Sequence, residues 1–404
     1  MITLFASVYD MPLQKVNKTP SLGLLHIVAG GEFMIYVVTS GDTLYSIAEM
    51  TGVPVEKIAY DNQIADMQQL AVGQALLLLQ PGEEGRYRDG LDVTGYAYPF
   101  IDAAVLNQTA NALDELLVFS YGFTFEGELV PPPVPDQWMI QWAWDHNIRP
   151  IMVLTPFLEG VFNNQLVKTV TENIEVQNIL IANVLATVQE KGFAGVDIDF
   201  EYILPENRED YAAFVGNMRS VMHAYGYQVS VALAPKERAD QPGLLYEGMD
   251  YRLLGENADS VFLMTYEWGY RYSPPMAVAP LNKVRQVVEY ALTEIPPEKI
   301  RMGIPNYGYD WTLPYEKGTS SAEVIGNVEA IRIAVDNNAR ILYGDIARSP
   351  YFTYTRDGIG HEVWFEDVRS IAEKLALATE YGLLGVGYWN LMRPFRANWL
   401  MLEK

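Results

Sequence analysis

From residue 91 onward the chain alternates short β-rich runs with longer amphipathic stretches, and this alternation restricts the fold more than any other feature. Eight such units in about 310 residues predict an α/β protein with a (β/α)8 TIM barrel over residues 91–404. An open, doubly wound sheet is the alternative, but no glycine-rich phosphate loop follows the first run. The β-rich runs cover residues 93–100, 116–123, 150–156, 195–202, 228–234, 260–266, 301–307 and 384–389.

The gap between the seventh and eighth runs is about 80 residues, far longer than an ordinary connection. Within it, residues 314–365 hold a helical stretch at 322–337 and strand-like runs at 351–354 and 362–365. We therefore expect a small α+β subdomain that is inserted after the seventh strand and packs on the rim of the barrel.

The fourth run carries three acidic residues at alternate positions. Successive side chains of a strand point to opposite faces, so Asp197, Asp199 and Glu201 share one face and the apolar residues between them share the other. The apolar face suits the surrounding helices, which directs the carboxylates into the barrel. Buried carboxylates at this spacing are costly unless they share protons, so they indicate chemistry. An edge strand with a solvated acidic face is the alternative, but its flanks are too apolar for that.

The composition leaves carboxylates and aromatic rings to carry the chemistry. The chain has 28 Lys and Arg against 51 Asp and Glu, and its formal charge of −23 argues against nucleic acids and anionic membranes as partners. It has no cysteine and four scattered histidines, so we expect no metal and no cofactor. No run reaches the roughly 18 apolar residues of a membrane-spanning helix, and the first residues do not resemble a signal peptide.

Residues 34–81 form a separate, shorter pattern ahead of the barrel. A β-rich start, a turn at 40–42, a helix capped by Asp42 or Thr43, a second helix after Pro54 and a closing strand at 75–79 predict a βααβ module. The turn-rich residues 82–90 are interpreted as a linker. Residues 1–33 show no period, and we interpret them as a flexible arm or an upstream artefact, with the natural start at Met34.

This module resembles a LysM domain over its whole length. The matching segments are, in order, YVVTSGDTLYSIA, DNQI and LAVGQALLL. The resemblance implies binding to glycans that contain N-acetylglucosamine, such as peptidoglycan or chitin, through the loops after the first strand and before the last. An unrelated βααβ adaptor is the alternative. The corresponding residues are Gly41, Asp42, Thr43, Asn62 and Ile64.

The acidic run GFAGVDIDFEY resembles the DxxDxDxE signature of glycoside hydrolase family 18. The sixth run ends in MTYEWG, similar to the family's MxYD segment, the seventh reads GIPNYG, and the eighth ends in Trp389, so the resemblance covers the whole barrel. An inserted α+β subdomain is also common in this family. Ala194 replaces the first Asp of the signature, and the third run lacks the usual SxGG segment. Because position 194 lies farthest from the substrate, we expect altered proton sharing rather than inactivity.

The resemblance implies a mechanism in which the acetamido group of the substrate is the nucleophile. Glu201, nearest the mouth of the barrel, would protonate the glycosidic oxygen and then activate water, which retains the configuration. Asp199 would hold the acetamido N–H, Tyr266 would hold its carbonyl, and Asp197 would share a proton with Asp199. Further contacts would come from Trp389 beneath the −1 ring and from the strand-end residues Tyr96, Tyr121, Trp268, Asn306, Tyr307 and Trp311.

Within the family, the chain looks most like the cortical fragment-lytic, spore-germination branch, whose members carry LysM modules and lack a signal peptide. These features predict an N-acetylglucosaminidase acting on peptidoglycan, because the −1 sugar must keep its 2-acetamido group and muramic lactam has lost it. A chitinase or other endo-β-N-acetylglucosaminidase is one alternative. A silent glycan-binding barrel is another, although such relatives have usually lost the acid that Glu201 supplies. The branch implies association with the spore cortex or coat after synthesis in the mother-cell cytoplasm.

Overall fold

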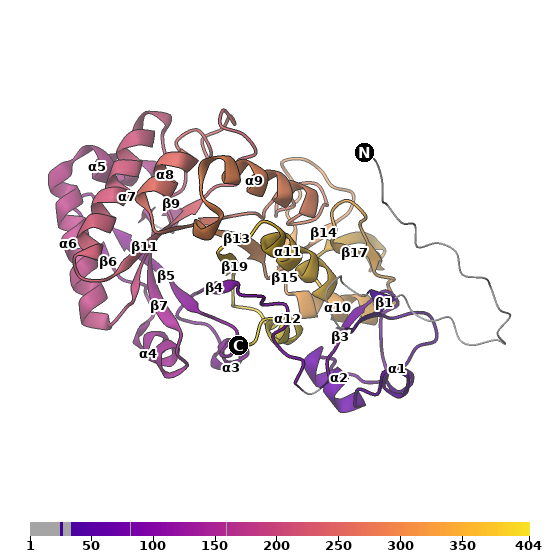
Figure 1. Cartoon of the computed structure of the whole chain (residues 1–404). Helices are drawn as coiled ribbons and strands as arrows, with labels where there is room; N and C mark the ends of the chain where they lie inside the picture. The colour runs from indigo at the N-terminus through magenta and orange to yellow at the C-terminus, as the bar shows by residue number, and fades with distance from the viewer. Residues whose placement is uncertain (1–24, 27–33, 81, 159) are drawn as a thin grey trace, which may run out of the picture.

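The computed structural model describes residues 25–26, 34–80, 82–158 and 160–404 (Figure 1). The predicted barrel is confirmed: eight parallel strands follow one another in the order β4-β19-β13-β12-β11-β10-β7-β5, and β4 also pairs with β5 to close the ring. A short strand, β6 (Leu129–Val130), pairs antiparallel with β5. The barrel strands are β4 (Asp92–Ala97), β5 (Glu115–Phe123), β7 (Arg149–Leu154), β10 (Gly195–Ile198), β11 (Gln228–Leu233), β12 (Ser260–Leu263), β13 (Ile300–Pro305) and β19 (Gly385–Trp389).

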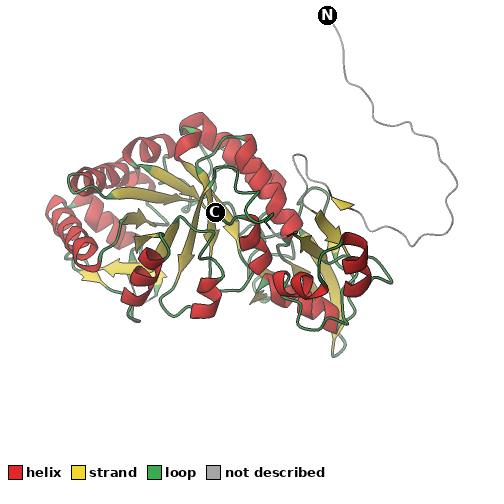
Figure 2. Cartoon of the chain, turned by 60° about the horizontal axis from the view of Figure 1, so that its bottom comes forward, coloured by secondary structure: helices red, strands yellow, loops and turns green. Residues whose placement is uncertain are grey.

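Helices surround the barrel (Figure 2). The chain between β7 and β10 forms two helices, because Asn173 leaves helical geometry and its side chain accepts hydrogen bonds from the first N–H groups of α6. None of the helices that the structure describes is long and apolar enough to cross a membrane. The helices of the barrel are α3 (Ala103–Asn107), α4 (Gln137–Asp145), α5 (Asn164–Glu172), α6 (Ile174–Lys191), α7 (Arg208–His223), α8 (Tyr251–Asn257), α9 (Leu281–Glu294), α11 (Val368–Glu380) and α12 (Arg396–Met401).

The inserted subdomain consists of a five-stranded antiparallel sheet and one helix, α10 (Asn327–Asp336). The helix begins later than the stretch predicted at 322–337, because residues 323–325 pair with β14 as a strand. The N–H of Gly326 then donates to the side chain of Glu329, which caps the helix. The sheet begins at Gly308, ahead of residue 314. Its strands, in spatial order, are β15 (Glu323–Ile325), β14 (Gly308–Thr312), β18 (Ile359–Trp364), β17 (Pro350–Arg356) and β16 (Leu342–Tyr343).

The N-terminal module has the predicted strand–helix–helix–strand order. Strand β2 (Met34–Val37) pairs antiparallel with β3 (Ala75–Leu78), and helices α1 (Leu44–Thr51) and α2 (Val55–Asp61) lie between them in the chain. Thr43 caps α1 by accepting a hydrogen bond from the N–H of Ser46. A further strand, β1 (Leu25–His26), pairs with β2 within the range that we interpreted as an arm. The other residues of that range lie outside the described residues.

The module packs directly against the inserted subdomain, as Figures 1 and 2 show. Ala71 belongs to the same apolar core as Ile341 and Phe352 of the subdomain. The N–H of Ile341 donates to the carbonyl oxygen of Val72 at 2.9 Å. A β-carbon at Gly73 would lie 1.9 Å from the Ile341 carbonyl oxygen, and the φ of +88° there also favours glycine. Gly73 therefore allows the close approach that joins the module to the barrel rim.

Candidate active site

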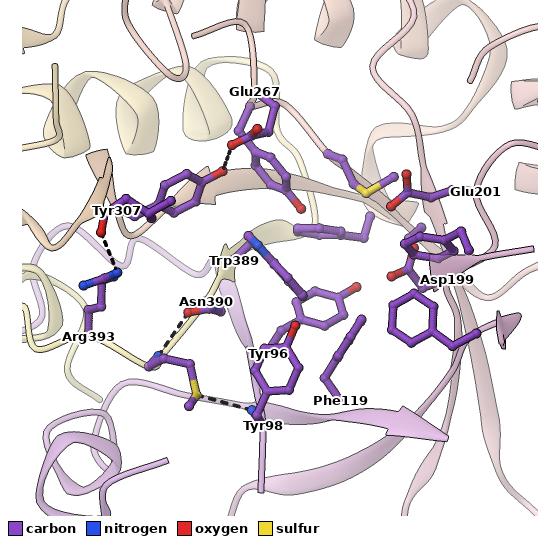
Figure 3. Close-up of a pocket in the computed structure, with 18 of the residues that line it drawn as sticks. Tyr96, Tyr98, Phe119, Asp199, Glu201, Glu267, Tyr307, Trp389, Asn390 and Arg393 are labelled. Atoms are coloured by element: carbon purple, nitrogen blue, oxygen red, sulfur yellow. Dashed lines mark hydrogen bonds between the residues drawn. The ribbon is translucent and has the colours of Figure 1, made fainter. Parts of the chain in front are cut away.

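A cavity of about 710 Å³ opens at the carboxyl ends of the barrel strands (Figure 3). This end of a (β/α)8 barrel carries the functional groups in characterised enzymes of the fold. Within the described ranges, no group of three or more acidic or histidine side chains is placed to hold a metal ion. Six of the predicted catalytic and substrate-binding residues line the cavity: Asp199, Glu201, Tyr266, Tyr96, Tyr307 and Trp389.

Asp197, Asp199 and Glu201 form an acidic row. Asp197 is the deepest of these three carboxylates and is fully buried on β10. The Ser230 hydroxyl donates to its Oδ1 at 2.5 Å, and the Tyr96 hydroxyl donates to its Oδ2 at 2.9 Å. Burial raises the pKa of Asp197, while these hydrogen bonds and the guanidinium of Arg301 oppose the rise. Asp197 thus lies beneath the cavity rather than in its lining, and Tyr96 connects it to the cavity.

Asp199 and Glu201 bring the acidic row into the cavity (Figure 3). Asp199 is 6% exposed, and its Oδ1 has no hydrogen-bond partner among the described residues. Burial, followed by the charges of Glu201 and Asp197, raises the pKa of Asp199 well above its usual value. Burial, followed by the charge of Glu267, raises the pKa of Glu201 to about 7. A carboxyl group with this pKa is partly protonated at neutral pH, as a general acid requires.

Tyr266 lines the cavity from the loop after β12. Burial, followed by the charges of Asp199 and Glu201, raises the pKa of its hydroxyl well above its usual value, so the hydroxyl remains a hydrogen-bond donor. A β-carbon on Gly303 of β13 would lie 2.9 Å from Cε1 of the tyrosine ring. Gly303 therefore leaves the space that the Tyr266 ring occupies.

Trp389 forms an aromatic floor at the end of β19. Its ring centroid lies 4.9 Å from that of Phe119, 5.6 Å from that of Tyr96 and 6.2 Å from that of Tyr98, all in edge-to-face geometry. Contacts of this kind are favourable beyond the apolar area that they bury. The indole is thus held rigidly, and such a flat apolar surface suits the face of a sugar ring.

Tyr121, predicted to line the cleft, lies outside the lining. The register of β5 against β7 shifts between Val118 and Tyr121, which changes the faces to which the following side chains point. Phe119 shares the inward face with Leu117, which pairs with Tyr96, and it lines the cavity. Tyr121 is buried against Phe193 instead, and its hydroxyl donates to Asp136.

Asn306, Trp268 and Trp311 also lie outside the cavity lining. The buried side chain of Asn306 donates to the carbonyl oxygens of Asn390 at 3.0 Å and Arg393 at 2.9 Å, so it supports the loop after β19. Trp268 packs against the apolar core. Trp311 is buried, and its Nε1 donates to the carbonyl oxygen of a neighbouring loop.

Glu267 is an acidic cavity residue that was not among the site residues predicted from the sequence. Its carboxylate accepts a hydrogen bond from the hydroxyl of Tyr307 at 2.5 Å (Figure 3). It accepts another from the hydroxyl of Tyr309 at 2.9 Å. The similarity of MTYEWG to the MxYD segment marked this position, but a loop has no periodicity from which to predict side-chain direction. Asn390 and Arg393 also line the cavity, and no sequence motif pointed to them.

The five residues predicted for LysM glycan binding lie in two loops of the module. Asp42 accepts three hydrogen bonds that close the turn after β2, and Asn62 braces β3 through two hydrogen bonds to its backbone. Thr43 caps α1, and Gly41 adopts a φ of +95° in the turn with open space beside it. Ile64 lines a groove between the module and α10. The polar members thus stabilise the conformation of the loops, and Ile64 is partly buried against the core of the module.

The model of the glycosyl hydrolases family 18 matches residues 162–393, which is more than half of the chain. The chain belongs to glycoside hydrolase family 18. The matched range contains the acidic row, Tyr266, Trp389 and the inserted subdomain. The LysM domain model matches residues 36–78 of this family 18 protein, within the N-terminal module.

Similar proteins include spore enzymes and a chitinase. The cortical fragment-lytic enzyme of Bacillus subtilis is 36% identical over 421 residues, which cover 91% of this chain and 97% of that protein. The crystal structure of the Bacillus cereus spore cortex-lytic enzyme SleL has a TM-score of 0.85 at 32% identity, covering 92% of this chain and 97% of that one. A chitinase from Chromobacterium violaceum has a TM-score of 0.71 at 26% identity, covering 77% of this chain and 98% of that one. This chain is thus a family 18 glycosylase with a LysM module, related to spore cortex-lytic enzymes.

Proposed function

We propose that this protein is a retaining N-acetylglucosaminidase that cleaves peptidoglycan after N-acetylglucosamine. One observation carries the proposal: the acid Glu201 and the carboxyl group of Asp199 line the same cavity, whose floor is Trp389. Buried polar atoms are normally hydrogen-bonded. The Asp199 side chain makes no hydrogen bond at Oδ1 among the described residues, and its carboxyl group can accept one from the acetamido N–H of a sugar over Trp389.

The chemistry then follows in two steps. Glu201 protonates the glycosidic oxygen while the acetamido carbonyl oxygen attacks the anomeric carbon, so the bond to the leaving sugar breaks as an oxazolinium ring forms. Asp199 orients the acetamido N–H and offsets the positive charge of the oxazolinium ring. The Tyr266 hydroxyl donates a hydrogen bond to the acetamido oxygen. Ionised Glu201 then removes a proton from water, which opens the ring with overall retention. Asp197 adjusts the charge of Asp199 by sharing a proton.

The substrate follows from the nucleophile. Muramic lactam lacks the acetamido group and cannot react at −1, so cleavage occurs after N-acetylglucosamine. Similarity to the cortical fragment-lytic enzyme of Bacillus subtilis supports spore cortex fragments as the polymer and the spore as the location. The LysM match supports anchoring to the same glycan. The formal charge of −23 matches the sign of the peptidoglycan carboxylates, so hydrogen bonds and ring stacking drive binding rather than net attraction.

Hydrolysis of chitin-like glycans is the second candidate function. The similarity to the Chromobacterium violaceum chitinase favours it, because the same chemistry acts on any polymer with an acetamido group at −1. A silent glycan-binding barrel is the third, and the presence of Glu201 in the cavity argues against it.

Digestion of purified spore cortex beside chitin oligomers tests these candidates. The full chain and its Glu201→Gln variant are incubated with each glycan, and mass spectrometry identifies the reducing ends of released fragments. We expect the wild type to release cortex fragments with N-acetylglucosamine at the reducing end, and the variant to bind the glycan without releasing fragments. Muramic acid at the reducing ends would exclude the proposed specificity. If neither protein releases fragments although both bind, the enzyme proposal fails.

A further inference from the structure

The cavity contains one basic side chain, Arg393, among the described residues that line it. The acidic side chains of the lining are Asp199, Glu201 and Glu267, and the others are mostly aromatic. Arg393 therefore provides a positive charge in the binding cavity of a strongly acidic protein. Figure 3 shows Arg393 on the opposite side of Trp389 from Glu201.

The guanidinium of Arg393 retains unused hydrogen-bond donors. Within the part of the chain that the structure describes, Nη2 donates to the carbonyl oxygen of Val324 at 2.9 Å, and Nη1 lies 3.5 Å from a carboxylate oxygen of Glu329. The Glu329 side chain is 47% exposed, and solvent-exposed pairs contribute about 1 kcal/mol or less. A guanidinium has five N–H donors in a fixed fork that matches a carboxylate. Arg393 can therefore bind a second carboxylate from the cavity side.

The backbone that carries Arg393 is held in place before any ligand binds. The side-chain amide of Asn306 donates to the carbonyl oxygens of Asn390 and Arg393, which ties two positions of this loop to the residue that follows β13. The aliphatic stem of Arg393 also runs beside Gly326, where a β-carbon would lie 3.4 Å from Cδ. A preorganised donor loses less conformational freedom on binding. These contacts distinguish Arg393 from a mobile surface arginine.

We infer that Arg393 forms a carboxylate-binding subsite for the muramic acid that precedes the cleaved N-acetylglucosamine. The inference rests on the proposed function, in which Trp389 underlies the −1 sugar and Glu201 protonates the leaving group. Sugars of the leaving group lie on the Glu201 side, so the opposite side, where Arg393 lies, receives the sugar at −2. In peptidoglycan a muramic acid at that position, unless it is the lactam, carries a carboxylate on its lactyl ether or attached peptide, whereas in chitin the sugar is uncharged. The subsite thereby selects peptidoglycan over chitin.

Two glycans that differ only in charge test this subsite. Peptide-free peptidoglycan strands carry a free lactyl carboxylate, which carbodiimide activation and borohydride reduction convert to a neutral alcohol. The kcat/KM of the full chain and of its Arg393→Gln variant is measured on both strands and on chitin oligosaccharides. We expect the wild type to favour the carboxylate strand by roughly tenfold or more, chiefly through KM, because hydrogen bonds to charged groups have that strength. The variant should lose this preference, so that its kcat/KM on the carboxylate strand falls to its value on the reduced strand.

Two further variants serve as controls. Arg393→Lys keeps the charge but not the fork and should retain part of the preference. Arg252→Gln removes an exposed arginine of α8, away from the cavity, and should behave as wild type. An undiminished preference in Arg393→Gln, or an equal loss on all three glycans, would overturn the subsite. A wild-type protein that cleaves none of these glycans contradicts the proposed function instead, so the two failures are distinguishable.

Discussion

Replacing Glu267 with Gln tests how the cavity raises the pKa of Glu201. The carboxylate of Glu267 is the second cause of the raised pKa of Glu201, after burial. Gln has nearly the same shape and keeps an oxygen that accepts from Tyr307 and Tyr309, so the substitution removes a charge with little repacking. The pKa of Glu201 should therefore fall, because an ionised Glu201 no longer faces a like charge.

The size of this effect follows from the two causes. The pKa of Glu201 rises from 4.5 to about 7, which corresponds to about 3 kcal/mol in favour of the protonated form. Burial is the larger cause, so Glu267 accounts for less than half of the rise. The Glu267→Gln variant should therefore lower the pKa of Glu201 by about one pH unit or less.

The assay is the pH dependence of kcat/KM on a peptidoglycan strand, which reports ionisations of the free enzyme. Glu201 must be protonated to act as the acid, so wild-type activity should fall as the pH rises through about 7. In Glu267→Gln this fall should occur at lower pH. Glu209→Gln, which removes the same charge from the exposed face of α7, should leave the profile unchanged. If kcat/KM of Glu267→Gln falls at the same pH as in the wild type, or at a higher pH, the proposed effect of Glu267 on the pKa of Glu201 is refuted.

Two stability predictions follow from buried contacts outside the cavity. Lys374 Nζ lies 2.8 Å from Glu366, and both side chains are fully buried. Lys374→Met should cost about 3–5 kcal/mol in chemical denaturation, because it leaves a buried carboxylate unpaired, and a loss within experimental error would contradict this. Gly73→Ala should cost more than about 1 kcal/mol, because it adds a clash with Ile341 to an unfavourable φ. Gly52→Ala is the control, because Gly52 has a similar φ of +74° but no contact closer than 3.9 Å. An equal loss of stability in the two variants would mean that the clash with Ile341 costs nothing.

Periodic elements were predictable from the sequence. Buried parallel strands are nearly continuous apolar runs between amphipathic helices, which is why the eight runs coincide with the eight barrel strands. The strand period also predicted that Asp197, Asp199 and Glu201 point to the inside of the barrel. The structure adds that Asp197 is sealed beneath the cavity while the other two reach it.

Positions that depend on irregular backbone were not predictable in the same way. A register shift in β5 removes Tyr121 from the cavity although Phe119, two residues earlier, lines it, and no residue pattern predicts such a shift. Glu267 and Arg393 lie in loops after β12 and β19, where the direction of a side chain depends on contacts made by distant segments. The backbone of Arg393 is held by a hydrogen bond from the side chain of Asn306. The GIPNYG segment had suggested Asn306 itself as a substrate-binding residue.

The central claim is that the substrate's own acetamido group is the nucleophile, with Glu201 as the acid. The most direct test compares the cleavage of two matched oligosaccharides that carry either N-acetylglucosamine or glucosamine at the −1 position. We expect cleavage after N-acetylglucosamine with release of the β-anomer, and no detectable cleavage after glucosamine. Cleavage of both oligosaccharides at comparable rates would contradict it.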